Sequence, residues 1–173
     1  MTSVGILTTS CKGHCDQFTP CIIRKTTGVE CLRVQDSNVD GNGTFVFRFS
    51  PEISAVGAVE LDPNTTHVVL TDGYPSDEVS RGELVNIFFD PTFVIAGEEI
   101  TDVTILNLNI SSADRLLSIL PKGTVNLWLE NTLMMEFPTV ALLQLRSLSD
   151  LNLDSNFIEE IGTGTYSDSL QSL

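Results

Sequence analysis

The chain has few of the residues on which nucleic-acid binding and acid–base catalysis depend. Among its 173 residues are two histidines and nine Lys or Arg residues, against 23 Asp or Glu, so the formal net charge is -14. Nucleic-acid binding rests on neutralising phosphates with Lys and Arg, and a surface this acidic repels them. No run approaches the roughly 18 apolar residues that a membrane-spanning helix needs. Nucleic acid and a membrane span within this chain are therefore excluded, and a neutral or basic partner is favoured.

Cysteine is absent after residue 31, and basic residues are scarce after residue 60. Residues 1–60 carry five Lys or Arg against six Asp or Glu, whereas residues 61–173 carry four against seventeen. The cysteines are Cys11, Cys15, Cys21 and Cys31. An even, clustered set predicts disulfides in a small N-terminal module and an extracellular or secreted location. Three pairings are possible, and the sequence does not choose among them.

Two further features bear on the compartment. A zinc site that adds His14 is the alternative for the cysteines, but structural zinc usually takes two close pairs of ligands, and only Cys11 and Cys15 are close. No signal peptide is evident, because the apolar stretch Val4–Leu7 is shorter than a secretory core of about 7–15 residues. Sequons begin at Asn42, Asn64 and Asn109. We predict glycans at Asn42 and Asn64 only, since Asn109 falls on an expected strand.

A β-hairpin is predicted between Cys31 and Ser50. Phe45, Phe47 and Phe49 alternate with other residues, which places three rings on one sheet face. The turn before them holds Asp36, Asn38 and Asp40, spaced like the first ligands of a calcium loop. The twelfth position of that loop should be Glu and is Phe47, so a hairpin turn is the favoured interpretation and calcium the alternative.

A repeated apolar pattern occupies the second half of the chain. Its clearest copy has spacings of three, two, three, two and three, at Leu148, Leu151, Leu153, Asn156, Ile158 and Ile161. The copy before it reads Thr124, Leu127, Leu129, Thr132, Met134 and Phe137. A third copy, placed at a shorter offset, reads Val103, Leu106, Leu108, Ser111, Ala113 and Leu116, and a fainter one starts at Leu84, Ile87 and Phe89. Between copies, Leu142, Leu145 and Leu148 predict a short helical return segment.

This pattern resembles the leucine-rich repeat, LxxLxLxxNxLxxIP, with a period of about 20–29 residues. The resemblance implies short parallel strands whose two leucines point into the solenoid. Asn156 stands at the asparagine position, where an amide can satisfy backbone groups as the strand bends away. The cysteines before degenerate repeats are similar to the N-terminal caps of extracellular leucine-rich-repeat domains, including those of oomycete receptor-like proteins and kinases.

We therefore expect an α/β solenoid of short parallel strands with irregular or short helical returns. Residues 1–50 are predicted to form a disulfide-stapled cap with a β-hairpin, because a solenoid end must be covered. Residues 51–83 are interpreted as degenerate first repeats or a linker. Residues 84–173 are interpreted as leucine-rich repeats, truncated at the C-terminus because Leu170 and Leu173 open a copy that is not completed.

The residues between the inward leucines predict an outward stripe on the concave face. The predicted ligand-binding residues are Asn107, Asn109, Asn126, Trp128, Glu130, Asp150, Asn152 and Asp154. Trp128 is the only Trp in the chain, and exposed Trp is enriched at binding hot spots. The flanking carboxylates favour ligands that carry Lys or Arg. This stripe predicts a protein- or peptide-binding module, the recognition part of a secreted or receptor-like protein.

Catalytic signals are weak. Only His14 and His67 could act as histidine bases, and no GxSxG motif places a serine nucleophile. We expect no enzyme activity, no cofactor and no metal. Two alternatives stay open: a small secreted hydrolase that uses His67 with a carboxylate, and a calcium-dependent adhesion module that uses Asp36, Asn38 and Asp40.

Overall fold

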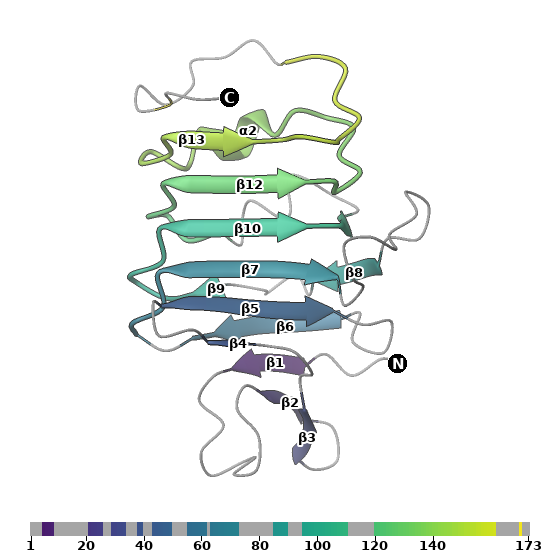
Figure 1. Cartoon of the computed structure of the whole chain (residues 1–173), viewed down its shortest axis with the longest axis vertical. Helices are drawn as coiled ribbons and strands as arrows, with labels where there is room; N and C mark the ends of the chain where they lie inside the picture. Colours follow the sequence, from purple (N-terminus) through teal and green to yellow (C-terminus); the bar gives the residue numbers. More distant parts are fainter. Residues whose placement is uncertain are drawn as a thin grey trace.

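The computed structural model describes strands along the whole chain and some of the segments that connect them (Figure 1). The described residues are 5–8, 21–25, 29–33, 38–39, 43–49, 55–61, 63–72, 85–89, 95–110, 120–161 and 170. Within them the chain forms two sheets and a single helix, the four-residue α2 (Thr139–Leu142). The helical share of the described part is therefore smaller than an α/β class implies.

The first sheet contains five parallel strands in chain order. They are β5 (Thr44–Phe49), β7 (His67–Asp72), β10 (Asp102–Leu106), β12 (Asn126–Glu130) and β13 (Asp150–Asn152). A short strand, β4 (Asn38–Val39), pairs antiparallel with β5 and forms the other edge. A short hairpin does precede Phe45, but its first strand lies inside the stretch that was expected to form the turn, and the strand that contains Cys31 pairs with Cys21–Lys25 instead. Phe45, Phe47 and Phe49 share one face as predicted and are all fully buried.

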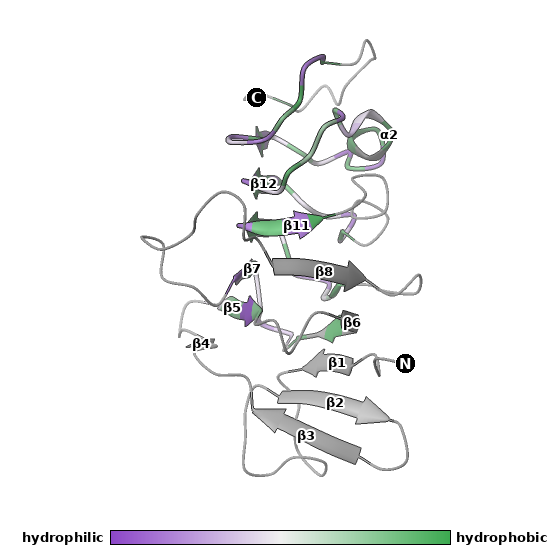
Figure 2. Cartoon of the chain, turned by 90° about the vertical axis from the view of Figure 1, so that its right-hand side faces the viewer, coloured by the Kyte–Doolittle hydropathy of each residue, from purple (hydrophilic) through white to green (hydrophobic). Residues whose placement is uncertain are grey.

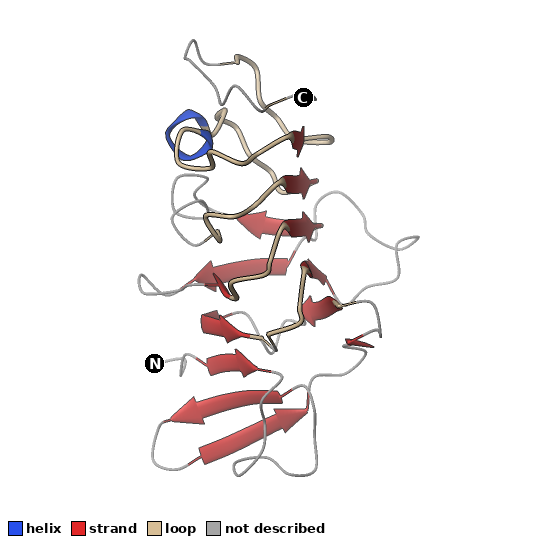
Figure 3. Cartoon of the chain, turned by 90° about the vertical axis from the view of Figure 1, so that its left-hand side faces the viewer, coloured by secondary structure: helices blue, strands red, loops and turns tan. Residues whose placement is uncertain are grey.

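The second sheet lies behind the first and receives the chain between successive strands of the first (Figure 2). Its parallel part contains β6 (Ala55–Glu60), β8 (Val85–Phe89) and β11 (Leu108–Ile110), and β9 (Ile95–Ala96) also pairs with β6. The N-terminal strands β1 (Gly5–Thr8), β2 (Cys21–Lys25) and β3 (Val29–Arg33) extend it. Each pass through both sides forms one coil. Between β12 and β13 the return side carries α2 in place of a strand (Figure 3).

The core consists of rows of inward side chains that run across the first sheet. One row, formed by successive Cα partners, is Phe45, Val68, Val103, Leu127 and Leu151. The next row is Phe47, Leu70, Ile105 and Leu129. All nine side chains are at most 3% exposed. Since full burial of such a side chain stabilises by roughly 1.5–3 kcal/mol, these rows hold the coils in register.

Backbone hydrogen bonds repeat at the start of each strand of the first sheet. One carbonyl accepts two consecutive N–H groups of the next coil, and these carbonyls belong to Gly43, Thr66, Thr101 and Val125. The N···O distances range from 2.7 to 3.2 Å. Gly43 has φ +80°, and a Cβ there would lie 2.7 Å from the carbonyl oxygen of Asn64, so only glycine fits this first corner. These paired hydrogen bonds set the register of each strand before the strand begins.

Asn156 satisfies backbone groups where the last strand bends away, as expected. Its Oδ1 accepts the Thr132 N–H at 3.0 Å, the Thr132 hydroxyl at 2.9 Å and the Met134 N–H at 3.2 Å. Its Nδ2 donates to the carbonyls of Leu129, at 2.6 Å, and Leu153, at 2.8 Å. An aspartate could not donate and a leucine could do neither, so the amide joins two coils.

The predicted register of the third copy is wrong. Asp102–Leu106 pairs with Asn126–Glu130, so the true offset is longer than the step from Val103 to Thr124 on which that copy was placed. Val103 and Ile105 therefore occupy the inward positions that Leu106 and Leu108 were expected to fill. The chain bends at Asn107, where φ is 55°, which leaves Leu106 half-buried on the outer side and sends Leu108 into β11 of the second sheet.

The fainter copy at Leu84 is also placed differently. Residues 85–89 form β8, which pairs with β6 and β11 in the second sheet. The strand that precedes β10 in the first sheet is β7, inside the stretch interpreted as degenerate repeats or a linker. The parallel sheet begins still earlier, at β5. The step from His67 to its partner Asp102 hides this relationship, because it exceeds a single repeat period.

Leu142, Leu145 and Leu148 form the predicted return segment. The helix α2 ends at Leu142, and the N–H groups of Leu145 and Leu148 donate to the carbonyls three residues before them, at 3.3 and 3.1 Å. All three side chains are at most 2% exposed. The spacing of three is thus a tight helical turn that covers the core, and this prediction is confirmed.

Candidate ligand-binding face

The side chains that alternate with the core rows point outward from the first sheet. We call this surface the outer face. Its cross-strand rows are Thr44–His67–Asp102–Asn126–Asp150, Val46–Val69–Thr104–Trp128–Asn152 and Arg48–Thr71–Leu106–Glu130. Each row brings together side chains that lie far apart in the sequence.

Trp128 is the largest side chain of the outer face, and its exposed fraction is 42%. The indole lies over β10, where its Cα partner Thr104 is only 5% exposed. The centroid of the His67 ring is 6.4 Å away at an interplanar angle of 70°, an edge-to-face arrangement. The expectation that Trp128 points outward is confirmed.

His67 was missed as a member of this face, because its strand was not legible in the sequence. Its Nε2 lies 3.0 Å from the Thr104 hydroxyl, and this hydrogen bond fixes the ring against Trp128. The two side chains could suggest a hydroxyl nucleophile with a histidine base. Thr104 is buried, however, and the Asp102 carboxylate on the neighbouring strand is engaged elsewhere. The hydrogen bond to Thr104 thus orients the imidazole against the indole of Trp128.

Carboxylates surround Trp128 on three sides. Asp102 accepts hydrogen bonds from the Thr101 hydroxyl, at 2.6 Å, and from the Asn126 amide. Glu130 is exposed two residues beyond Trp128, and Asp150 is the Cα partner of Asn126. Among the described outward positions of β7, β10, β12 and β13 there is no Lys or Arg. In this described part of the outer face, the carboxylates around Trp128 are therefore not balanced by a Lys or Arg side chain.

Asn152 and Asp154 form the end of the face beyond β13. The Asp154 N–H donates to Asn152 Oδ1 at 2.8 Å, and Asn152 Nδ2 donates to Asp154 Oδ2 at 3.3 Å. Asp154 follows Glu130 by the same step that separates the paired residues of β12 and β13, and it is exposed. Six of the predicted binding residues are thus brought together: Asn126, Trp128, Glu130, Asp150, Asn152 and Asp154.

Asn107 and Asn109 do not belong to the outer face, which corrects their predicted placement. Asn107 lies in the bend after β10, and its Oδ1 accepts a hydrogen bond from Asn131 Nδ2 at 2.9 Å. Asn109 lies on β11 of the second sheet, opposite Asn86. Both were misplaced by the shorter offset of the third copy. An equal offset for both steps would have selected Thr104 and Leu106 in their place, which are the Cα partners of Trp128 and Glu130.

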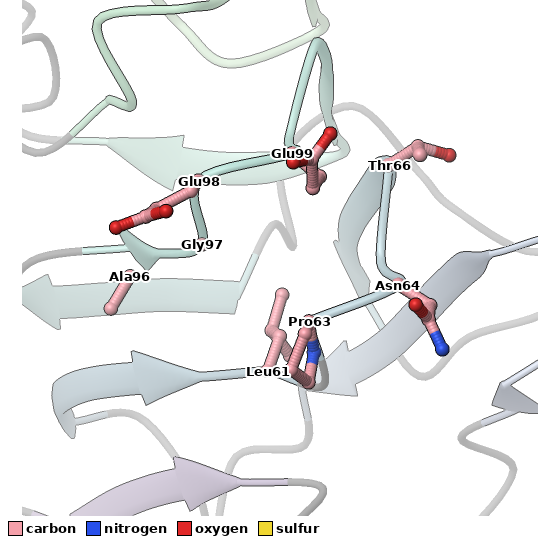
Figure 4. A pocket seen from close by; sticks show the side chains of 8 residues that line it. All are labelled: Leu61, Pro63, Asn64, Thr66, Ala96, Gly97, Glu98 and Glu99. Atoms are coloured by element: carbon pink, nitrogen blue, oxygen red, sulfur yellow. The ribbon is translucent and has the colours of Figure 1, made fainter.

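A cavity of about 670 Å³ opens beside the strand starts, between the turns that precede β7 and β10 (Figure 4). It is lined by Leu61, Pro63, Asn64, Thr66, Ala96, Gly97, Glu98 and Glu99. Both glutamates are exposed in the turn that precedes β10. Among the described residues, the ionisable groups of the lining are the carboxylates of Glu98 and Glu99.

The remaining predicted sites are only partly within the described residues. Cys11, Cys15, Asn42, Asp36 and Asp40 lie outside them, as do the side chains of Cys21 and Cys31 on β2 and β3. Asn64 is exposed in the turn before β7. In the described part of the chain, no three His, Cys, Asp or Glu side chains are grouped to hold a metal ion. No helix there is long and apolar enough to span a membrane.

Comparison with known proteins adds no relative. The sequence matches no family model and no curated protein, and the structure matches no solved structure.

Proposed function

We propose that the chain is a non-catalytic protein- or peptide-recognition module of the leucine-rich-repeat type, which binds its ligand on the outer face. The observation that carries this proposal is the exposed Trp128 on β12, one strand from the edge of the parallel sheet, against the His67 ring that is hydrogen-bonded to Thr104. Exposing an indole is unfavourable unless a partner covers it, and Trp dominates binding hot spots. The in-and-out alternation of β12 and β13 and the amide contacts of Asn156 support the repeat type.

The partner we propose is a neutral or basic protein or peptide. The face carries Asp102, Glu130, Asp150 and Asp154, and residues 61–173 carry most of the net negative charge of the chain. Complementary charge speeds association and selects against acidic partners. The N-terminal cysteines and the sequons at Asn42 and Asn64 support a secreted or receptor-like parent protein, with disulfides and glycans in the first coils.

The test is selection of peptides from a random display library on the purified chain, followed by affinity measurements on two variants. We expect Trp128→Ala to weaken the selected peptides at least tenfold, because a hot-spot residue contributes roughly 2 kcal/mol or more. Glu136→Ala is the matched control, since Glu136 is exposed on the return segment outside the outer face. It should change affinity less than twofold. Equal losses in both variants would count against the outer face as the binding surface.

A further inference from the structure

Trp128 occupies the centre of a ring of acidic positions on three strands. Its Cα partners are Thr104 on β10 and Asn152 on β13. Toward the start of those strands the next outward residues are Asp102 and Asp150, and toward the end of β10 the next outward residue is Leu106. Diagonal neighbours in a sheet lie about 7–8 Å apart, within reach of a long side chain that rests on the indole. Glu130 completes the ring along β12. The exposed indole of Trp128 thus has carboxylates on both flanking strands.

This combination fits one class of ligand group. A Lys or Arg cation over an indole is attracted by the ring quadrupole, and a carboxylate within reach adds a charge-assisted hydrogen bond. Neutral or acidic side chains gain neither interaction. Arginine gains most, because its planar guanidinium can stack on the ring and donate in its plane to a carboxylate.

His67 is placed to oppose such a cation. Its ring meets Trp128 edge-to-face, and it is the Cα partner of Asp102. Among the described residues, the other groups that face His67 are uncharged: Thr44 on β5 and Thr104 on β10. Arg48 lies at the far end of β5, in another row, and Glu98 and Glu99 lie at the cavity that Thr66 lines. A proton on His67 would therefore place a positive charge directly beside the indole and Asp102.

We infer that the outer face holds one arginine or lysine side chain of the partner over Trp128, between Glu130 and the aspartates of β10 and β13, and that His67 weakens this binding when it is protonated. The inference rests on the proposed function and adds to it the ligand group and its regulation. Protonation of His67 should therefore weaken the binding of the cation without abolishing it.

The binding arm of the test uses the fluorescence of Trp128, which is the only Trp of the chain. The probes are an acetylated tetra-arginine amide and its tetra-citrulline counterpart, which has nearly the same shape but no charge. At pH 7.5 and physiological salt we expect saturable quenching by the arginine peptide and none by the citrulline peptide. Glu130→Gln should weaken the arginine peptide at least threefold, and Glu136→Gln less than twofold. Equal effects of the two variants would indicate attraction by net charge alone and would overturn the inference.

The pH arm compares the wild type with His67→Gln, because glutamine can keep a hydrogen bond to Thr104. Between pH 7.5 and 5.5 we expect the wild-type affinity for the arginine peptide to fall at least threefold and that of His67→Gln to change less than twofold. Equal pH dependence in both proteins would refute the role of His67. If display-selected peptides need Trp128 but contain no Arg or Lys, the inference fails while the proposed function stands. If they do not need Trp128, both fail.

Discussion

The N-terminal and C-terminal coils of the first sheet have different residues at the bend that follows each strand. In the C-terminal coils, the bend that follows each strand falls on Asn107, Asn131 and Ser155, which are equally spaced along the chain and have φ values of 55°, 52° and 59°. In the N-terminal coils, the corresponding row holds Phe49 and Asp72. Asparagine tolerates positive φ and can hydrogen-bond to its copy in the next coil, as Asn131 does to Asn107. Where the bends are equally spaced along the chain, polar residues of successive coils stack on one another. Where the spacing differs, as in the N-terminal coils, an apolar and a charged residue are paired at this position.

The difference extends to the return side of the coils. The coils that begin with β5, β7 and β10 include strands β6, β8 and β11 on the return side, whereas the coil between β12 and β13 returns through α2 and its following turns. Both returns cover the same core, with Val59 and Ile95 in one region and Leu142 and Leu145 in the other. The shared requirement is an apolar surface behind the sheet, and the conformation of the return segment depends on the local sequence.

The largest expected effect is on stability, and it tests whether Val103 and Ile105 or Leu106 and Leu108 are the inward residues of this repeat. Ile105→Ala removes a fully buried side chain and should lower the free energy of unfolding by about 2–5 kcal/mol. Leu106→Ala removes a half-buried side chain on the outer side and should lower it by about 1 kcal/mol. Urea denaturation measures both. If Leu106→Ala lowered the free energy of unfolding more than Ile105→Ala, the predicted register of the third copy would be supported instead.

A smaller effect is expected at the junction of the last two coils. Asn156→Ala leaves the N–H groups of Thr132 and Met134 without their acceptor and should lower the free energy of unfolding by about 2–3 kcal/mol. Asn152→Ala is the control, since its hydrogen bonds to Asp154 are exposed, and should change stability by less than about 1 kcal/mol. Similar denaturation midpoints for the two variants would mean that the amide of Asn156 does not join the coils.

The smallest effect is a gain in stability in the N-terminal coils. Asp72 is 2% exposed, and its Oδ2 has no hydrogen-bond partner among the described residues. Burial raises the pKa of Asp72, against the opposing effects of hydrogen bonds from Thr71 and Asn107 and the charge of Arg48. A pKa that is higher in the folded than in the unfolded state means that ionised Asp72 destabilises the fold, and this penalty is absent below the unfolded pKa.

Asp72→Asn should therefore raise Tm by about 2–4 °C at pH 7, because about 1 kcal/mol corresponds to such a shift in a chain of this size. The gain should shrink toward zero as the pH falls through the carboxylate range. Asp154→Asn, on an exposed side chain, should leave Tm unchanged at both pH values. A gain at Asp72 that persists in acid would show that the amide acts by extending the asparagine ladder and not by removing a buried charge.

Several features could be predicted because one local pattern had only one sensible interpretation. The alternation of Phe45, Phe47 and Phe49, the spacing of Leu142, Leu145 and Leu148, and the amide at Asn156 all correspond to what the structure contains. The outward position of Trp128 followed from its place between Leu127 and Leu129. In each case the neighbours along the chain determine which way the side chain points.

The register of β10 could not be predicted in the same way. Both Val103 with Ile105 and Leu106 with Leu108 fit the inward positions of a strand, and the second pair matches the leucine pattern better. The difference lies in Asn107, whose positive φ separates the two pairs into different sheets. His67 was likewise missed, since the partner of its strand, β10, lies more than one repeat period further along the chain.

The sequence alone determined the composition of the faces: apolar residues at alternate positions, a single indole between two leucines, and a strongly acidic second half. Those properties depend on side-chain chemistry and on neighbours one or two residues away. Only the tertiary structure decided which strands are adjacent, and so brought His67, Thr104 and Trp128 into one cluster. Adjacency depends on the lengths of the returns and on where the backbone bends, and neither leaves a periodic signal in the chain.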